Sequence, residues 1–324
     1  MDCRMTLRRT CAAFALALSA AANAQDYPSK PVRVIVPWPP GGLVDAAGRV
    51  VGEKLAAALG QPFVLDNKPG AGGVIGAEQA AKAPADGYTL VLTTSALTMN
   101  AALQAKLPFD VLRDFEPIAA AAHTPQVLVA YPGLGFKSVQ DLIAAAKARP
   151  GRMSYASAGN GSPAHLAGEL FKSMLGLDIL HVPYKGAPPA MTDQIAGRVD
   201  FHFANAAVAL PQVRAGKVQG LAVASAQRAP FAPELPTMAE AGVANFEADQ
   251  WVGYLAPRGT PRAVIERLNA AIGRALSSED AKALLAQSGM AAAAPATPAQ
   301  FGAALKADLA RWSAVVKSAN IRPE

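Results

Sequence analysis

Two glycine-rich turns carry the residue types best suited to holding an anion. Pro39-Pro40-Gly41-Gly42 lies between an apolar segment and a helical pattern, and Gly159-Asn160-Gly161-Ser162 has the same placement later in the chain. A helix N-terminus presents unpaired backbone N–H groups, and glycine lets a carboxylate or phosphate approach them closely. We therefore expect both turns to contribute to a site for a small anion. The alternative is that glycine and proline only shape tight turns, which is the simpler interpretation for either turn alone.

Asp45 stands in the first turn of the helical pattern that follows Gly42. A carboxylate at this position interacts favourably with the helix dipole and can cap free N–H groups. In a binding site it would instead order the turn, hold a water molecule or receive a ligand amine. The sequence leaves both roles open.

Ser162 and His165 lie three residues apart at the start of a predicted helix, which raises the alternative of an exported hydrolase or isomerase. Capping and loop bracing are the favoured roles of this pair, because the Walker A, H-E-x-x-H and G-x-S-x-G motifs are all absent. Gly70-Ala71-Gly72 also departs from the dinucleotide motif G-x-G-x-x-G, since Ile75 stands where its third glycine belongs. We expect no catalytic residues and no cofactor.

A metal site is not expected either. The four histidines have no spacing typical of a metal pair: His123, His165, His181 and His202. Both cysteines, Cys3 and Cys11, lie near the N-terminus, inside a segment that has the pattern of a signal peptide.

That signal peptide is predicted over residues 1–24. Arg4, Arg8 and Arg9 precede an apolar run too short to span a bilayer, and Ala22-Asn23-Ala24 matches the small-x-small pattern before a cleavage site. We expect cleavage before Gln25 and a soluble periplasmic product. No later stretch is apolar enough to predict a membrane span.

Composition narrows the class of partner. The net charge of +6 is diffuse, which weakly favours an anionic small molecule, and no basic stripe interleaved with aromatics indicates nucleic acid. Aromatic residues make up only 6% of the chain, which argues against a sugar site built on stacked rings. We expect a monomer, and an adaptor without any ligand is the third functional alternative.

The elements that position the turns follow a strand–turn–helix rhythm, which is typical of an open parallel α/β sheet. Strands are predicted at 30–36, 63–65, 88–92, 127–130, 154–156, 179–182, 199–203 and 220–224, and helices at 43–59, from the 67–73 turn to 83, and at 139–148, 163–175 and 190–196. The rhythm breaks once and resumes, so we expect lobe one over 25–124 plus 226–324 and lobe two over 125–225. The chain would cross between lobes near Thr124 and near Ser225 and form a hinge. Helices at 262–276 and from 297–298 to about 316 are expected to cover the outside of lobe one.

Several of these segments together resemble the Bug-type receptors of tripartite tricarboxylate transporters. The similar segments span the chain in order: 34–45 (VIVPWPPGGLVD), 59–62 (LGQP), 67–73 (NKPGAGG), 86–90 (DGYTL), 158–166 (AGNGSPAHL), 181–186 (HVPYKG) and 253–261 (GYLAPRGTP). The resemblance implies a two-lobe periplasmic-binding-protein fold, the type II Venus flytrap, with a central cleft. It also implies a receptor that closes on a small carboxylate and delivers it to a membrane permease of this type or to a sensor.

Members of this family hold the carboxylate mainly through backbone amides, small polar side chains and ordered waters. The resemblance therefore assigns ligand contacts to Gly41, Gly42, Asp45, Ser157, Gly159, Asn160, Gly161 and Ser162. It adds further cleft candidates at Trp38, Ser95, Tyr184, Lys185 and Asn205. Where relatives often have Phe-Asp-Asn, this chain has Phe203-Ala204-Asn205. The loss of an acidic group favours a plain carboxylate over an amino acid.

Overall fold

The computed structural model describes residues 27–104, 106–318 and 321. The predicted signal peptide at 1–24 and both cysteines lie outside the described residues. Within this part of the chain, no helix has the length and apolar character needed to cross a membrane.

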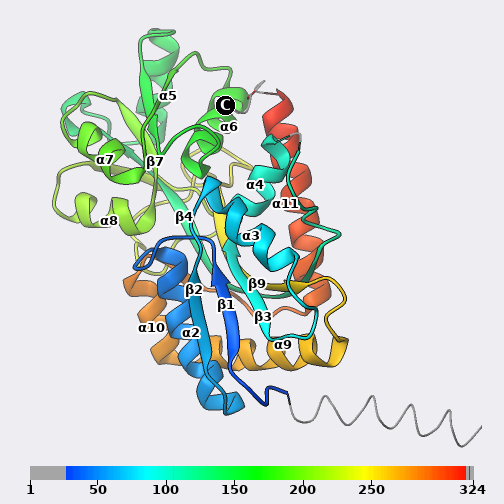
Figure 1. Cartoon of the computed structure of the whole chain (residues 1–324). Helices are drawn as coiled ribbons and strands as arrows, with labels where there is room; N and C mark the ends of the chain where they lie inside the picture. The colour runs from blue at the N-terminus through cyan, green and yellow to red at the C-terminus, as the bar shows by residue number, and fades with distance from the viewer. Residues whose placement is uncertain (1–26, 105, 319–320, 322–324) are drawn as a thin grey trace, which may run out of the picture.

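One long mixed sheet runs through the molecule, in the strand order β2-β1-β3-β9-β4-β7-β5-β6. Its first section contains β1 (Val32–Val36), β2 (Phe63–Asn67) and β3 (Thr89–Thr94) in parallel, followed by β9 (Asp249–Pro257), which is antiparallel to β3. Its second section contains β5 (Ser154–Ser157), β6 (Leu180–Pro183) and β7 (Phe201–Asn205) in parallel. Figure 1 shows the two sections at opposite ends of the molecule, each covered by its own helices.

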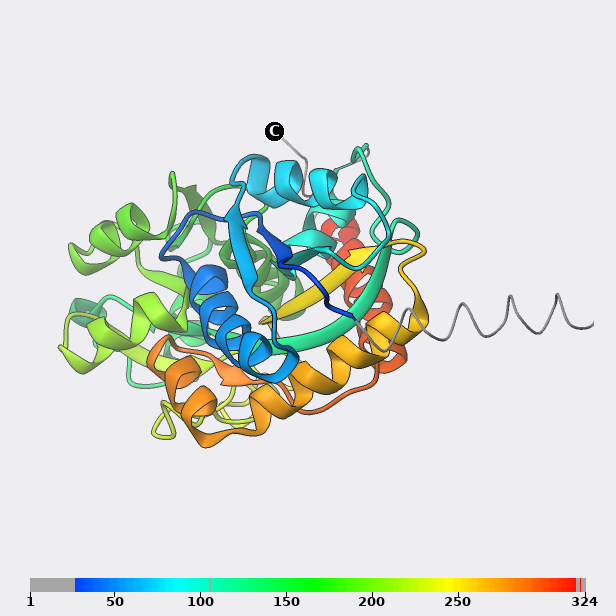
Figure 2. The same cartoon turned by 60° about the horizontal axis from the view of Figure 1, so that its bottom comes forward.

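The strand β4 (Phe115–Ala130) joins the two sections. Its first part, up to Pro125, pairs with β9, and its second part pairs with β7 and with β8 (Gln219–Val223). The short strand β10 (Ala291–Ala292) pairs with the middle of β4. Figures 1 and 2 both show β4 running along β9 and on toward β7, so these strands form the backbone link between the two ends.

Twelve helical segments connect and cover the strands of the described chain. In the first section they are α2 (Leu43–Leu59), the 3-10 turn η1 (Ala71–Gly73), α3 (Val74–Ala81) and α4 (Ala96–Leu103). The second section has η2 (Pro132–Leu134), α5 (Val139–Ala148), α6 (Pro163–Leu175), α7 (Ala187–Ile195) and α8 (Ala206–Arg214). The C-terminal part supplies α9 (Arg262–Ser277), α10 (Glu279–Gln287) and α11 (Pro298–Ser318).

The helix bounds follow local sequence signals closely. The helix α2 spans the predicted 43–59 and ends at Gly60, whose φ of 75° lies in the left-handed region that glycine adopts without strain. Its buried face is the predicted one, with Val44, Ala47, Val51 and Leu55 in the core of the first section. The expected strand–turn–helix rhythm is therefore present on both sides of β4.

The helix α5 begins with a complete capping box. The Ser138 hydroxyl accepts a hydrogen bond from the Asp141 N–H, and the Asp141 carboxylate accepts one from the Ser138 N–H. We expect Ser138→Ala to lower the free energy of unfolding by about 1 kcal/mol, measured by urea denaturation. The control Ser277→Ala removes an exposed hydroxyl that only contacts the Gly273 carbonyl of its own helix. Equal effects of the two changes would contradict a special role for the cap.

The second crossing between the lobes was predicted near Ser225. After Ser225 the chain does not return at once, because Met238, Val243 and Phe246 pack in the core of the second section. The Phe246 ring stacks on Phe203 with 5.3 Å between ring centroids. The return is made by β9, which begins at Asp249 and was not predicted as a strand. The lobe ranges 25–124, 125–225 and 226–324 stay a prediction.

The last helix also reaches further than expected. Phe301 and Leu305 of α11 pack on the first section, as predicted, but Trp312 and Val315 belong to the core of the second. Apolar residues of α4, Met99 and Leu103, lie in that same core. Both sections are therefore tied to α4 and α11 as well as to the two long strands.

Candidate ligand-binding pocket

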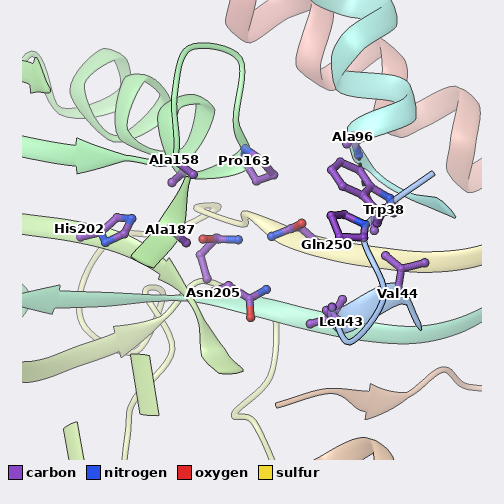
Figure 3. A pocket seen from close by; sticks show the side chains of 15 residues that line it. Trp38, Leu43, Val44, Ala96, Ala158, Pro163, Ala187, His202, Asn205 and Gln250 are labelled. Atoms are coloured by element: carbon purple, nitrogen blue, oxygen red, sulfur yellow. Dashed lines mark hydrogen bonds between the residues drawn. The ribbon is translucent and has the colours of Figure 1, made fainter. Parts of the chain in front are cut away.

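A cavity of about 270 Å³ lies between the two sections of the sheet. It is found where strands end and helices begin, the usual ligand position in an open α/β sheet. Figure 3 shows Trp38, Leu43 and Val44 on one side, Ala158, Ala187 and His202 on the other, and Gln250 between them. The lining consists of Trp38, Pro39, Gly42, Leu43, Val44, Thr94, Ala96, Gln126, Ala158, Pro163, Ala164, Ala187, His202, Asn205 and Gln250.

The wall from the first section is built on the turn between β1 and α2. Gly42 precedes the helix, and no side chain caps the N-terminus of α2. The residues that begin the helix, Leu43 and Val44, line the cavity. Free N–H groups at this N-terminus, together with the helix dipole, can therefore hold an anion in the cavity.

Asp45 holds this turn in place through its hydrogen bonds. It is only 1% exposed and accepts hydrogen bonds from the Gly41 N–H at 3.0 Å, Arg49 Nε at 2.8 Å and Asn67 Nδ2 at 3.1 Å. Burial opposes ionisation of Asp45, but these hydrogen bonds outweigh it and lower the pKa of the carboxyl below its ordinary value of 3.8. Since its oxygens are already engaged and it does not line the cavity, Asp45 positions the turn.

The opposite wall is the loop between β5 and α6. The Ser162 hydroxyl accepts a hydrogen bond from the His165 N–H, and the His165 ring nitrogen Nδ1 accepts one from the Gly161 N–H. These are the capping and bracing roles that the sequence favoured for the pair. Ala158, Pro163 and Ala164 are the residues of this loop and helix start that reach the cavity.

A stack of two histidines supports the same loop. The ring of His181 lies parallel to that of His165 with centroids 4.1 Å apart, and its Nε2 lies 2.6 Å from the Ser157 hydroxyl. The Gly159 N–H also donates to that hydroxyl. Burial, with His165 and Lys172 nearby, lowers the pKa of His181 to about 3, so the imidazole is neutral at pH 7. Sequence spacing did not indicate this contact, because strand pairing creates it.

The floor of the cavity is polar. Thr124 lies opposite Gln250 in the β4–β9 pair, and Gln126 lies opposite Asn205 in the β4–β7 pair. Residues opposite each other on neighbouring strands share a face, as do residues two apart on one strand, so these four side chains lie together. The Asn205 carboxamide caps α8 at Ala207 and donates to Thr124.

His202 borders the cavity from β7 and is only 1% exposed. Burial lowers the pKa of His202 to about 4, which makes it neutral at pH 7. No hydrogen-bond partner for its Nδ1 occurs among the described residues. The lining thus contains neither acidic nor permanently charged side chains.

Of the predicted ligand contacts, Trp38, Gly42 and Asn205 line the cavity. The others lie in the adjoining turns and strand ends without reaching its lining: Gly41, Asp45, Ser95, Ser157, Gly159, Asn160, Gly161, Ser162, Tyr184 and Lys185. Ser95 is buried, the Tyr184 hydroxyl donates to Asp193, and Lys185 is exposed. The assignment of ligand contacts stays a prediction.

Four polar lining residues were missed: Thr94, Gln126, His202 and Gln250. Thr94 is the last residue of β3 and His202 is the second residue of β7, so each is a polar residue close to a strand terminus. No local sequence pattern indicated that Gln126 or Gln250 would line the cavity. No group of three or more His, Cys, Asp or Glu side chains suited to a metal ion occurs in the described part of the chain.

Comparison with known proteins agrees with this architecture. Residues 47–321 match the model of the tripartite tricarboxylate transporter family receptor. The chain is 40% identical to Protein BugT of Bordetella pertussis over 302 residues, which cover 93% of this chain and 92% of that protein. It superposes on R. palustris Rpa4515 with adipate at a TM-score of 0.80 and 36% identity, over 92% of this chain and all of the other.

A third similarity is to the periplasmic binding protein BugD. The TM-score is 0.77 at 32% identity, and the match covers 92% of this chain and 100% of the other. The predicted periplasmic-binding-protein fold is therefore confirmed.

Proposed function

The chain belongs to the tripartite tricarboxylate transporter family of receptors, and on that premise we propose that it captures a small carboxylate in the cavity between its two sheet sections. The observation that carries this proposal is the N-terminus of α2, which no side chain caps and which begins at the cavity. A carboxylate is a typical ligand of such a helix N-terminus. The adipate bound to Rpa4515 supports the same ligand class.

The walls fit a short ligand with an apolar body. Most of the lining side chains are apolar, and the volume of about 270 Å³ lies near the lower end of ligand pockets. A tricarboxylate carries three separate charges, and few groups in the lining of this cavity could pair with them.

A plain carboxylate fits the cavity better than an amino acid. Ala204 is buried in an apolar cluster, and the carboxylate of Asp45 beside the turn is engaged by Gly41, Arg49 and Asn67. No acidic side chain among the described residues lines the cavity to receive an ammonium group. Tight binding of glutamate or aspartate, with no response to non-amino carboxylates, would contradict this part of the proposal.

We place the mature protein in the periplasm after removal of residues 1–24, where it acts as a monomer. Binding would bring the two sections together about β4 and β9 and present the closed form to a membrane permease of the tripartite type or to a sensor. The ligand drives closure only if it binds the closed form more tightly than the open one.

A thermal-shift screen tests the proposed function. The purified protein is first stripped of bound ligand by partial unfolding and dialysis, and then mixed with mono-, di- and tricarboxylates, aromatic acids and acidic amino acids. A ligand at about a hundred times its dissociation constant stabilises the folded state by about 2.7 kcal/mol, which raises the melting temperature by about 4–5 °C for a protein of this size. We expect such a shift with a small set of carboxylates. A stripped protein that responds to none of them would refute carboxylate capture.

A further inference from the structure

A chain of hydrogen bonds joins the two sheet sections at the edge of the cavity. The Asn205 carboxamide, which lines the cavity (Figure 3), accepts a bond from the Ala207 N–H at 3.0 Å and donates one to the Thr124 hydroxyl at 3.3 Å. Thr124, which is fully buried, donates in turn to the Gly289 carbonyl at 3.1 Å. The chain therefore runs from a cavity residue through the long strand β4 to the turn between α10 and β10.

The donors and acceptors of this chain can be arranged in one way. A carbonyl oxygen only accepts, so the Thr124 hydroxyl gives its proton to Gly289 and offers its lone pairs to Asn205. The Ala207 N–H only donates, so the atom that faces it is Asn205 Oδ1. Both ends of the chain place Asn205 Nδ2 toward Thr124, and the carboxamide cannot turn over without breaking both of its bonds.

One hydrogen of the Asn205 carboxamide is left without a partner. Nδ2 carries two hydrogens, and among the described residues only Thr124 accepts a bond from it. The oxygen already caps α8, so the group that Asn205 still offers is an N–H donor. A ligand that displaces water from this wall must replace the lost hydrogen bond, and an oxygen acceptor does so.

Gly289 reaches the end of this chain because it has no side chain. Its φ is 68°, in the left-handed region, and a Cβ there would lie 2.7 Å from the Ala207 backbone nitrogen. The next residue, Met290, is buried in the core of the first section, whereas Ala206 and Ala209 of α8 belong to a core cluster of the second. The turn therefore meets α8 across the boundary between the two sections.

We infer that Thr124 and Gly289 are positioning residues for ligand binding, which fix the Asn205 carboxamide so that its second N–H donates to an oxygen of the bound acid. Thr124 acts through its hydroxyl, and Gly289 acts through a carbonyl that a larger residue could not bring so close to α8. The binding half of this inference rests on the proposed function, whereas the orientation of Asn205 does not.

The orientation of Asn205 can be tested without any ligand. Nuclear magnetic resonance of the stripped, isotope-labelled protein resolves the side-chain carboxamide signals, and those of Asn205 are assigned by their loss in Asn205→Asp. We expect Thr124→Val to shift the Asn205 signals, whereas Thr124→Ser keeps the hydroxyl and should leave them close to their original positions. Asn205 signals that are the same in Thr124→Val as in the unchanged protein would overturn the inference.

The effect on binding is measured by calorimetric titration with adipate, or with the acid of largest thermal shift if adipate gives none. Thr124→Val should raise the dissociation constant about tenfold, and Thr124→Ser should keep it within about twofold of the original value. If no acid binds, the proposed function and the binding half of the inference fail together, and the carboxamide signals still decide the orientation of Asn205.

The control for this change is Thr260→Val, which removes another buried hydroxyl. Thr260 donates to the Pro257 carbonyl and does not line the cavity. Thr260→Val should lower the melting temperature without changing the affinity. Equal weakening of binding by Thr260→Val and Thr124→Val would show a general effect of stability and would overturn the positioning role.

A pair of glycine variants isolates the contact between the turn and α8. Gly289→Ala and Gly216→Ala both place alanine in a left-handed backbone, with φ of 68° and 67°, but a Cβ at Gly216 would meet no atom within 4 Å. Both variants should have a lower melting temperature. Only Gly289→Ala should shift the Asn205 signals and weaken binding of the same acid about tenfold. Equal affinities of the two variants would contradict the role assigned to Gly289.

Discussion

Replacing Ala158 with phenylalanine will abolish carboxylate binding while the protein remains folded. Ala158 lines the cavity from the loop between β5 and α6, on the side opposite Trp38 (Figure 3). A benzyl group at this position would occupy much of the volume of about 270 Å³ that the ligand needs. We expect the affinity to fall by about 100-fold or more, measured by calorimetric titration with the best carboxylate of the screen.

The matched control for this change is Ala144→Phe, which places the same group on the exposed face of α5. The melting temperatures of both variants should remain close to that of the unchanged protein, because neither position is fully buried or replaces a core contact. An Ala158→Phe variant that binds within threefold of the original would show that the ligand occupies some other place.

The second large effect is expected at Asp45, through the order of the turn that precedes α2. Asp45→Ala leaves the Gly41 N–H and the Arg49 guanidinium without their acceptor and removes one of the two hydrogen bonds that Asn67 Nδ2 donates. We expect a loss of about 3 kcal/mol in the free energy of unfolding and a weakening of ligand binding by about tenfold. Urea denaturation and calorimetric titration measure the two quantities.

The loss of stability should depend on pH in a definite direction. The pKa of Asp45 is lowered in the folded state, so its ionised form stabilises the protein fully above the ordinary value of 3.8. That contribution disappears as the pH falls through the lowered folded-state pKa. The stability difference between the original protein and Asp45→Asn should therefore be largest near pH 7 and should shrink in strong acid.

Glu53→Ala is the control, because Glu53 is an exposed acidic residue on the same helix. It should have little effect at any pH, as is usual for a surface substitution. If Asp45→Ala proved no more destabilising than Glu53→Ala, the ordering role assigned to the buried carboxylate would be wrong.

Local patterns in the sequence determined most of the secondary structure. The bounds of α2, α5 and α6 follow from residues that start or stop a helix: Gly42 and Gly60, Ser138, and Ser162 with Pro163. Such signals act within a few residues and can be recognised in one chain. The turn before α2 was predicted to hold an anion for the same reason.

Other elements were missed because their local patterns are weak. The helix α8 contains Pro211, and α4 is only eight residues long and mostly apolar, so neither shows a clear helical face. In β9, the segment Asp249–Pro257 is buried almost throughout and lacks the alternation of a half-exposed strand. Tertiary packing decides these elements.

The sequence by itself determined the family and the α/β rhythm, because each depends on neighbouring residues. For the same reason it predicted the turn before α2 as an anion-binding turn. Only the tertiary structure decided the floor of the cavity. Gln126 and Gln250 meet there because β4 pairs with β9 on one edge and with β7 on the other, which brings distant parts of the chain together. The late return of the chain at Asp249 has the same cause, since Phe246 first completes the core of the second section. Strand pairing and core packing act between residues that are distant in the sequence, so no local motif predicts them.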